Sequence, residues 1–264
     1  MNPILYHPAY IFHPGRVPLL ISMPHIGTHM PKEQKDLLSE EASSLPDTDW
    51  HLDKVYSFAR EMGAGLLMAQ YSRFLIDLNR PEDDKPLYEG ATTGLFPDRL
   101  FNGKPIYKKT PETGWRDIYF RYLWKNYHQR LRRELDWMKE KFGYAILLDA
   151  HSIASHIPRL FEGVLPHFNL GTHDGYSCEK SLADDVFDIL SKNSRYQAVL
   201  NGRFKGGYIT RHYGQPQDHI HALQLELAQR SYMKEEAPYS FDPIEAAQLQ
   251  PILKQVIARL IQGL

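Results

Sequence analysis

Cysteine is almost absent from the 264-residue chain, whose one cysteine, Cys178, has no second cysteine with which to form an internal disulfide. Such scarcity is typical of proteins in a reducing compartment, so we expect a cytoplasmic protein. An excess of one charge is absent too, because 31 Lys and Arg residues against 32 Asp and Glu residues give a formal net charge of −1. A nearly neutral chain has no overall attraction to nucleic acids or anionic membranes, and we expect neither as a partner.

Long hydrophobic runs are also missing. The longest apolar stretches, residues 64–69 and 144–148, are far shorter than the ~18 residues that span a bilayer. The first seven residues, MNPILYH, lack the basic and apolar regions of a signal peptide. Repeats and Gly/Ser linkers are absent, while helical and strand patterns alternate throughout. We therefore expect one α/β domain that spans residues 1–264.

Short apolar runs bounded by turn residues predict buried strands. The predicted strands are residues 18–23, 65–69, 74–78, 145–148, 197–200, 208–210 and 221–227. Apolar residues that recur every three or four positions predict helices at 49–62, 115–142 and 179–192. A last helix begins after Asp242 as N-cap, and we expect Pro251 to kink or restart it. The Pro- and Gly-rich segment 81–111 is either a loop that covers a site or a plain surface excursion.

Histidine is abundant, with 13 residues, and two of them lie at predicted strand ends, where ligand sites of α/β sheets gather. His25 follows strand 18–23 and is either a metal ligand or the cap of a loop. The Gly- and Pro-rich turn after it disfavours the helix that would pair it with His29 as a zinc ligand. His151 shares a strand face with Asp149, the arrangement in which a carboxylate orients a metal-binding imidazole.

Acidic residues mark two further positions. Asp47, Asp49 and Asp53 lie at the start of predicted helix 49–62, where they are either N-cap residues or metal ligands. Glu226 lies inside an apolar strand, on the same face as Gln224. Glutamate is disfavoured in such a strand, so Glu226 is either paired with a cation or catalytic.

Basic residues suggest an anion-binding site. Arg73, Asn79 and Arg80 flank predicted strand 74–78, and Arg211 lies in a turn-rich stretch. A guanidinium binds a carboxylate in a bidentate geometry, so these residues are candidates for substrate binding. The alternative is an internal salt bridge between an arginine and Asp77.

The order and spacing of these motifs resemble the N-formylglutamate amidohydrolase family of the zinc carboxypeptidase and aspartoacylase clan. The motifs are Pro24-His25-Ile26-Gly27-Thr28, Asp49-Trp50, Ser72-Arg73, Asp77-Leu78-Asn79-Arg80-Pro81, Asp149-Ala150-His151-Ser152, Thr210-Arg211-His212-Tyr213-Gly214 and Gln224-Leu225-Glu226-Leu227. The resemblance implies a three-layer α/β/α fold with a mixed central sheet, of the zinc carboxypeptidase (phosphorylase/hydrolase-like) type. It also implies one Zn²⁺ per chain and hydrolysis of the dicarboxylate N-formyl-L-glutamate to formate and L-glutamate, a closing step of histidine breakdown.

The resemblance also implies the roles of individual residues. His25 and His151 match the two imidazole ligands of the metal. Glu226 matches the glutamate that activates the attacking water, and Arg73 matches the arginine that polarises the scissile carbonyl. The chain departs from the wider clan at the third ligand, because Thr28 stands where the clan has a carboxylate. Asp49 is our candidate for this ligand, with Asp53 and Asp47 as alternatives.

For substrate binding, Asn79 and Arg80 match the pair that holds a carboxylate, and we expect Arg211 to help hold the two carboxylates of the substrate. A related zinc amidase that acts on another N-acyl amino acid or a small peptide is the alternative function. A non-enzymatic binding protein on the same scaffold would lack the general base, whereas Glu226 is present. The sequence carries no signal for the oligomeric state.

Overall fold

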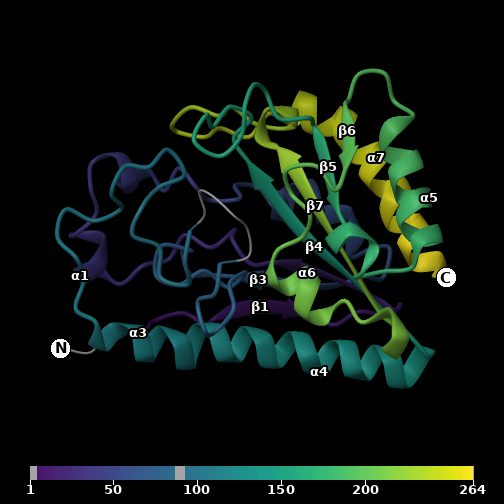
Figure 1. Ribbon diagram of the computed structural model, residues 1–264, viewed down its shortest axis with the longest axis horizontal. Coiled ribbons are helices and arrows are strands. Elements are labelled where there is room, and N and C mark those ends of the chain that lie inside the picture. Colours follow the sequence, from purple (N-terminus) through teal and green to yellow (C-terminus); the bar gives the residue numbers. More distant parts are fainter. Residues whose placement is uncertain (1–4, 87–92, 264) are drawn as a thin grey trace.

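A computed structural model describes residues 5–86 and 93–263. Within these residues the centre is a mixed seven-stranded sheet with the strand order β1-β3-β2-β4-β7-β5-β6 (Figure 1). The strands are β1 (Tyr10–His13), β2 (Leu19–Met23), β3 (Gly65–Ala69), β4 (Ala145–Ile153), β5 (Phe168–Gly171), β6 (Ala198–Leu200) and β7 (Ile220–Ala228). Strands β2, β3, β4 and β7 run parallel to one another, while β1, β5 and β6 run in the opposite direction.

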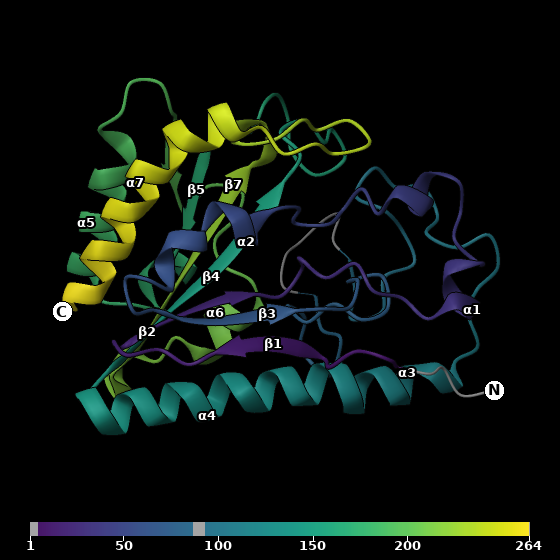
Figure 2. The same ribbon diagram turned by 180° about the vertical axis from the view of Figure 1, so that it is seen from behind.

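Helices cover both faces of this sheet. The helices of the described residues are α1 (Lys32–Lys35), which lies away from the sheet, α2 (Leu52–Val55), α3 (Gly114–Tyr119), α4 (Lys125–Phe142), α5 (Lys180–Ser191), α6 (Tyr208–Tyr213) and α7 (Pro243–Gln262). Alternate side chains of a strand point to opposite faces, so Ile146 and Leu148 pack with α2, α5 and α7, while Ala145 and Leu147 pack with α4 and α6. Figures 1 and 2 show α5 and α7 side by side and α4 along the other side. The expected three-layer α/β/α fold with a mixed sheet is confirmed.

The helix predicted at 115–142 is continuous but not uniform. A π-helical segment, Phe120–Trp124, joins α3 to α4. Gly143 ends α4 in the left-handed conformation, which glycine adopts without a steric cost. Asp242 caps α7 as expected, because its carboxylate accepts hydrogen bonds from the backbone N–H groups of residues 244 and 245. Pro251 lies inside α7 and does not restart the helix.

Three predicted elements are wrong. Residues 74–78 are buried but wound into turns, because an apolar run does not distinguish a buried strand from a buried turn. Residues 208–210 begin helix α6, with extended Gly207 as N-cap. The helix predicted at 49–62 is broken by His51 in the left-handed conformation, so that only α2 and the 3₁₀ turn Ser57–Ala59 form.

Two strands were not predicted, and both are short. Strand β1 is a half-buried edge strand, and β5 is interrupted by the polar Asn169. The described parts of segment 81–111 contain no helix or strand, and residues 87–92 lie outside the described residues. No helix in the part of the chain that the structure describes is both long and apolar enough to cross a membrane.

Candidate active site

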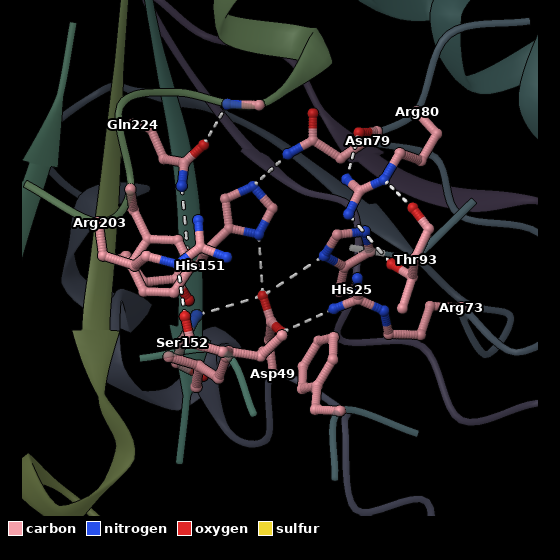
Figure 3. A pocket seen from close by; sticks show the side chains of 16 residues that line it. His25, Asp49, Arg73, Asn79, Arg80, Thr93, His151, Ser152, Arg203 and Gln224 are labelled. Atoms are coloured by element: carbon pink, nitrogen blue, oxygen red, sulfur yellow. Dashed lines mark hydrogen bonds and ion pairs between the residues drawn. The ribbon is translucent and has the colours of Figure 1, made fainter. Parts of the chain in front are cut away.

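A pocket lies at the carboxyl ends of the parallel strands β2, β4 and β7 (Figure 3). Seven of the eight site residues predicted from the sequence line it: His25, Asp49, Arg73, Asn79, Arg80, His151 and Glu226. The eighth, Arg211, is not among the described residues that line the pocket. Thr93 and Phe101, from segment 81–111, line it as well, so this segment contributes to the site.

His25, Asp49 and His151 form the one group of three among the described residues that is arranged to hold a metal ion. One potential ligand atom from each residue lies within 4.8 Å of the others, and all three residues are buried. The Oδ2 atom of Asp49 lies 3.0 Å from Nδ1 of His151 and 3.8 Å from Nδ1 of His25. Two imidazoles and one carboxylate are a ligand set typical of catalytic zinc.

Each histidine is oriented by a second carboxylate on the far side of its ring. Nε2 of His25 lies 2.7 Å from Oδ1 of Asp77, and Nε2 of His151 lies 3.0 Å from Oδ2 of Asp149. Since a carboxylate only accepts, the Asp77 contact favours a hydrogen on Nε2 of His25 and leaves its Nδ1 for a metal. Nε2 of His151 also lies 2.9 Å from the amide Nδ2 of Asn79, and its Nδ1 lies 3.0 Å from Oδ2 of Asp49, so Asp149 alone does not assign the hydrogen of that ring. Metal-binding histidines in proteins almost always have such a partner.

A metal ion fits this site because an orphaned buried atom points into it. Nδ1 of His25 is buried and has no hydrogen-bond partner among the described residues. Burial, together with the charge of Arg73, lowers the pKa of His25, so its ring is held neutral as a ligand must be. The pKa of His151 lies well above its usual range. Burial alone would lower it, but the negative charges of Asp149 and Asp49 outweigh the effect of burial. The site attracts positive charge.

The position of Asp49 separates it from the two alternative acidic residues. Its backbone N–H donates to the carbonyl of His25, and its Oδ2 accepts from the N–H of Ser152. Asp47 instead accepts from the N–H of Phe101, and burial raises its pKa to about 6. Asp53 is exposed on α2. Among the three candidates, Asp49 therefore has the geometry of a ligand.

Arg73 lines the pocket and is 7% exposed. Its Nη2 lies 2.6 Å from Oδ2 of Asp77, and its Nη1 lies 3.9 Å from Oδ1 of Asp49. Burial would raise the pKa of Asp77, but the charges of Arg73 and His25 hold it well below its usual range. The salt bridge considered from the sequence is thus present, and Arg73 still lines the pocket.

Glu226 faces the same pocket from β7, where it is the register partner of His151 in β4. Burial raises the pKa of Glu226 to about 8, although the charge of His151 acts in the opposite direction. Among the described residues, Gln224 is its side-chain hydrogen-bond partner, and Nε2 of Gln224 donates to Oε2 of Glu226 at 3.2 Å. A buried carboxyl with a pKa near neutrality is suited to accept and return a proton.

Asn79 and Arg80 line the pocket but also make bonds within the fold. The amide of Asn79 accepts from the N–H of Ile209 and donates to Asp149, which orients His151. Arg80 donates from Nε to the backbone carbonyl of Thr93 and from Nη1 to the backbone carbonyl of Asn79. The role of this pair in substrate binding stays a prediction.

Arg203 lines the pocket and was not predicted. It follows β6, and its Nε donates to the carbonyl of Leu160. Arg211 instead lies on α6, where its Nε donates to the carbonyl of Gly206. Arg203 follows no predicted site motif in the sequence. Its place in the pocket becomes visible only from the path of the chain between β6 and α6.

A protein-family model described as N-formylglutamate amidohydrolase matches residues 17–233. The chain belongs to this family. This N-formylglutamate amidohydrolase family member is an amidohydrolase, and the resemblance inferred from its motifs is confirmed.

Relatives agree with this family assignment. An N-formylglutamate deformylase of Pseudomonas putida is 56% identical over 252 residues, which cover 95% of this chain and 94% of the relative. A protein of the same name from Pseudomonas aeruginosa is 52% identical over 255 residues, or 96% of this chain and 94% of the relative. The crystal structure of N-formylglutamate amidohydrolase from Ralstonia eutropha JMP134 has the same fold, with a TM-score of 0.83 at 24% identity, and covers 99% of this chain and 98% of that one.

Proposed function

We propose that this chain hydrolyses N-formyl-L-glutamate to formate and L-glutamate with one Zn²⁺ bound by His25, Asp49 and His151. The observation that carries the proposal is the arrangement of these three residues opposite Glu226 in one pocket. Identity of 56% and 52% to proteins named N-formylglutamate deformylase supports the choice of substrate. The reaction belongs to histidine degradation, and the scarcity of cysteine fits activity in the cytoplasm.

The residues around the site fit the steps of amide hydrolysis. A Zn²⁺ ion held there would act as a Lewis acid and lower the pKa of a bound water from 15.7 to about 7. Glu226 accepts a proton from the attacking water, whose oxygen forms a bond to the formyl carbon. The guanidinium of Arg73 stabilises the negative charge that develops on the former carbonyl oxygen. Glu226 then gives the proton to the glutamate nitrogen as the carbon–nitrogen bond breaks, which leaves formate and the free amine.

The substrate brings two carboxylates, which need positive charge in the same pocket. Arg80 and Arg203 line it, so we assign to Arg203 the role that the sequence had suggested for Arg211. Desolvated guanidinium–carboxylate pairs are strong and directional, which favours a dianionic substrate over a neutral one.

The test is an assay of formate release from N-formylglutamate, beside hydrolysis of N-acetylglutamate and N-succinylglutamate. We expect formate from the formyl substrate, loss of activity after treatment with a chelator, and recovery with added Zn²⁺. Faster hydrolysis of the acetyl or succinyl substrate would favour the alternative, a related amidase for another N-acyl amino acid. Full activity in the chelated, metal-free enzyme would exclude zinc dependence.

A further inference from the structure

Gln224 connects the proposed general base to helix α6. Its Oε1 accepts the backbone N–H of Gly207 at 2.6 Å, and its Nε2 donates to Oε2 of Glu226 at 3.2 Å. Gln224 and Glu226 are both buried, at 4% and 7% exposure, and they lie on the same face of β7. Gln224 therefore lies between a fixed backbone donor and the carboxylate that is to move protons.

The polarity of these two bonds fixes the orientation of the Gln224 amide. A backbone N–H only donates, so the amide oxygen must face Gly207 and the NH₂ group must face Glu226. That NH₂ group in turn requires an acceptor, so Oε2 of Glu226 is held as an unprotonated oxygen. No other described residue donates to the Glu226 carboxylate, which leaves Oε1 for the proton of the reaction.

The backbone approaches Gln224 closely at two glycines. Gly171 in β5 is the register partner of Gln224, and a Cβ atom there would lie 2.6 Å from the N atom of Gly206. A Cβ atom on Gly207 would lie 2.4 Å from Nδ2 of Asn79. Only glycine lets the segment before α6 lie against β5 and reach Gln224.

The same turn of α6 also supports a metal ligand. The N–H of Ile209 donates to Oδ1 of Asn79, and Nδ2 of Asn79 donates to Asp149, which orients His151. The backbone N–H groups of Gly207 and Ile209, two residues apart in one turn, are thus linked to Glu226 through Gln224 and to the candidate metal site through Asn79. This arrangement sets the position of the base relative to the metal ligands.

We propose that Gln224 is a positioning residue for the general base, which holds Oε2 of Glu226 and presents Oε1 to the attacking water. The proposal rests on the proposed function, in which Glu226 is the base. Because Gln224 acts through Glu226, its removal lowers kcat and leaves KM and metal content near their wild-type values. Misplacement of a reacting group by about 1 Å costs on the order of 100-fold in rate, so we expect a loss of about 10–100-fold.

The experiment is a double-mutant cycle between Gln224→Met and Glu226→Gln, assayed by formate release with the zinc-loaded enzyme. Each single variant lowers kcat, but Gln224→Met has no further effect in the Glu226→Gln background, because the group through which it acts is already absent. Ser177→Ala is the matched control. The buried Ser177 hydroxyl donates to the carbonyl of Ala222, which lies on β7 as Gln224 does, and Ser177 is not among the described residues that line the pocket. A general weakening of β7 would lower the melting temperature of the control and of Gln224→Met alike.

A second variant protects the test against a failure to fold. Gln224→Glu is nearly isosteric and keeps the acceptor for Gly207, but it replaces the donor to Glu226 with a carboxylate oxygen. It should lose kcat by a similar factor with unchanged metal content. Equal losses from Gln224→Met in both backgrounds, or a change in KM alone, would overturn the positioning role. A Glu226→Gln enzyme with more than about a tenth of wild-type kcat would instead overturn the base assignment on which the positioning role depends.

Discussion

The carboxylate of Asp77 and the ring of His25 are joined by a 2.7 Å contact between Oδ1 and Nε2. This contact decides which nitrogen of His25 faces the pocket, because the carboxylate holds the hydrogen on Nε2 and leaves the lone pair on Nδ1. On the neighbouring strand, Nε2 of His151 lies 3.0 Å from Oδ2 of Asp149 and 2.9 Å from the amide Nδ2 of Asn79. Each candidate imidazole ligand therefore has a carboxylate beside its Nε2, and for His25 that carboxylate also assigns the hydrogen of the ring.

Replacement of Asp77 tests this orientation. Asp77→Asn keeps the size of the side chain but removes the negative charge that faces His25 and Arg73. Partners of this kind contribute about 10–100-fold to metal affinity, and we expect Zn²⁺ to bind more weakly by that factor in competition with a chelator. Asp83→Asn is the control, since Asp83 is exposed and pairs with Lys85. Unchanged zinc affinity in Asp77→Asn would show that the contact does not orient a ligand.

The third ligand is tested by a pair of acidic residues that are four positions apart. Asp49→Ala removes a buried carboxylate next to both imidazoles, whereas Asp53→Ala removes an exposed one on α2. We expect elemental analysis to find no bound metal in Asp49→Ala and one equivalent in Asp53→Ala, because two imidazoles alone make an incomplete site. The opposite result would transfer the ligand role to Asp53. His25→Ala and His151→Ala should lose the metal as Asp49→Ala does.

Charge selectivity is tested at the two arginines on the path from β6 through α6. Arg203→Met should lower kcat/KM for N-formylglutamate by about 10–100-fold, because a charged hydrogen bond contributes about 1.5–3 kcal/mol. Its effect on N-formylglutamine, which lacks the second carboxylate, should be much smaller. Arg211→Met should leave both values near wild type, since Arg211 is not among the described residues of the pocket. Equal turnover of the two substrates by the wild-type enzyme would count against any charge recognition.

The positions of the metal-site residues were predictable because they follow from sheet topology. His25 and His151 follow apolar runs that form the adjacent parallel strands β2 and β4, and parallel strands bring their carboxyl ends to one edge. Glu226 was predictable as a candidate because glutamate is disfavoured in an apolar strand unless it is paired with a cation or has a function. The apolar runs alone placed these residues at one edge of the sheet, whereas the roles expected of them came from the resemblance to the family.

The positions of the arginines depended on local structure that periodicity does not specify. Residues 208–210 were expected to form a strand and Arg211 to lie in a turn-rich stretch. Residues 208–210 instead form the first turn of α6, in which Nε of Arg211 donates to the carbonyl of Gly206. Extended Gly207 begins that turn in contact with Gln224, which is distant in the sequence. A tertiary contact thus overrides a weak local preference in this segment.

The last prediction concerns a histidine outside the active site. His128 on α4 is buried, with Nε2 at 2.9 Å from the carbonyl of Leu78 and Nδ1 at 3.0 Å from the hydroxyl of Tyr213. Burial lowers its pKa to about 3 from a usual value of 6.5. Below pH 6.5 the unfolded chain takes up a proton at this residue and the folded chain does not, so the folded state loses stability as the pH falls. One such group changes the free energy of unfolding by about 1.4 kcal/mol per pH unit, or about 2 kcal/mol between pH 6.5 and 5.

His128→Gln keeps a donor for Leu78 but does not titrate, so urea denaturation at several pH values should show a shallower decline for the variant. Parallel declines in the two proteins would show that His128 binds a proton in the folded state.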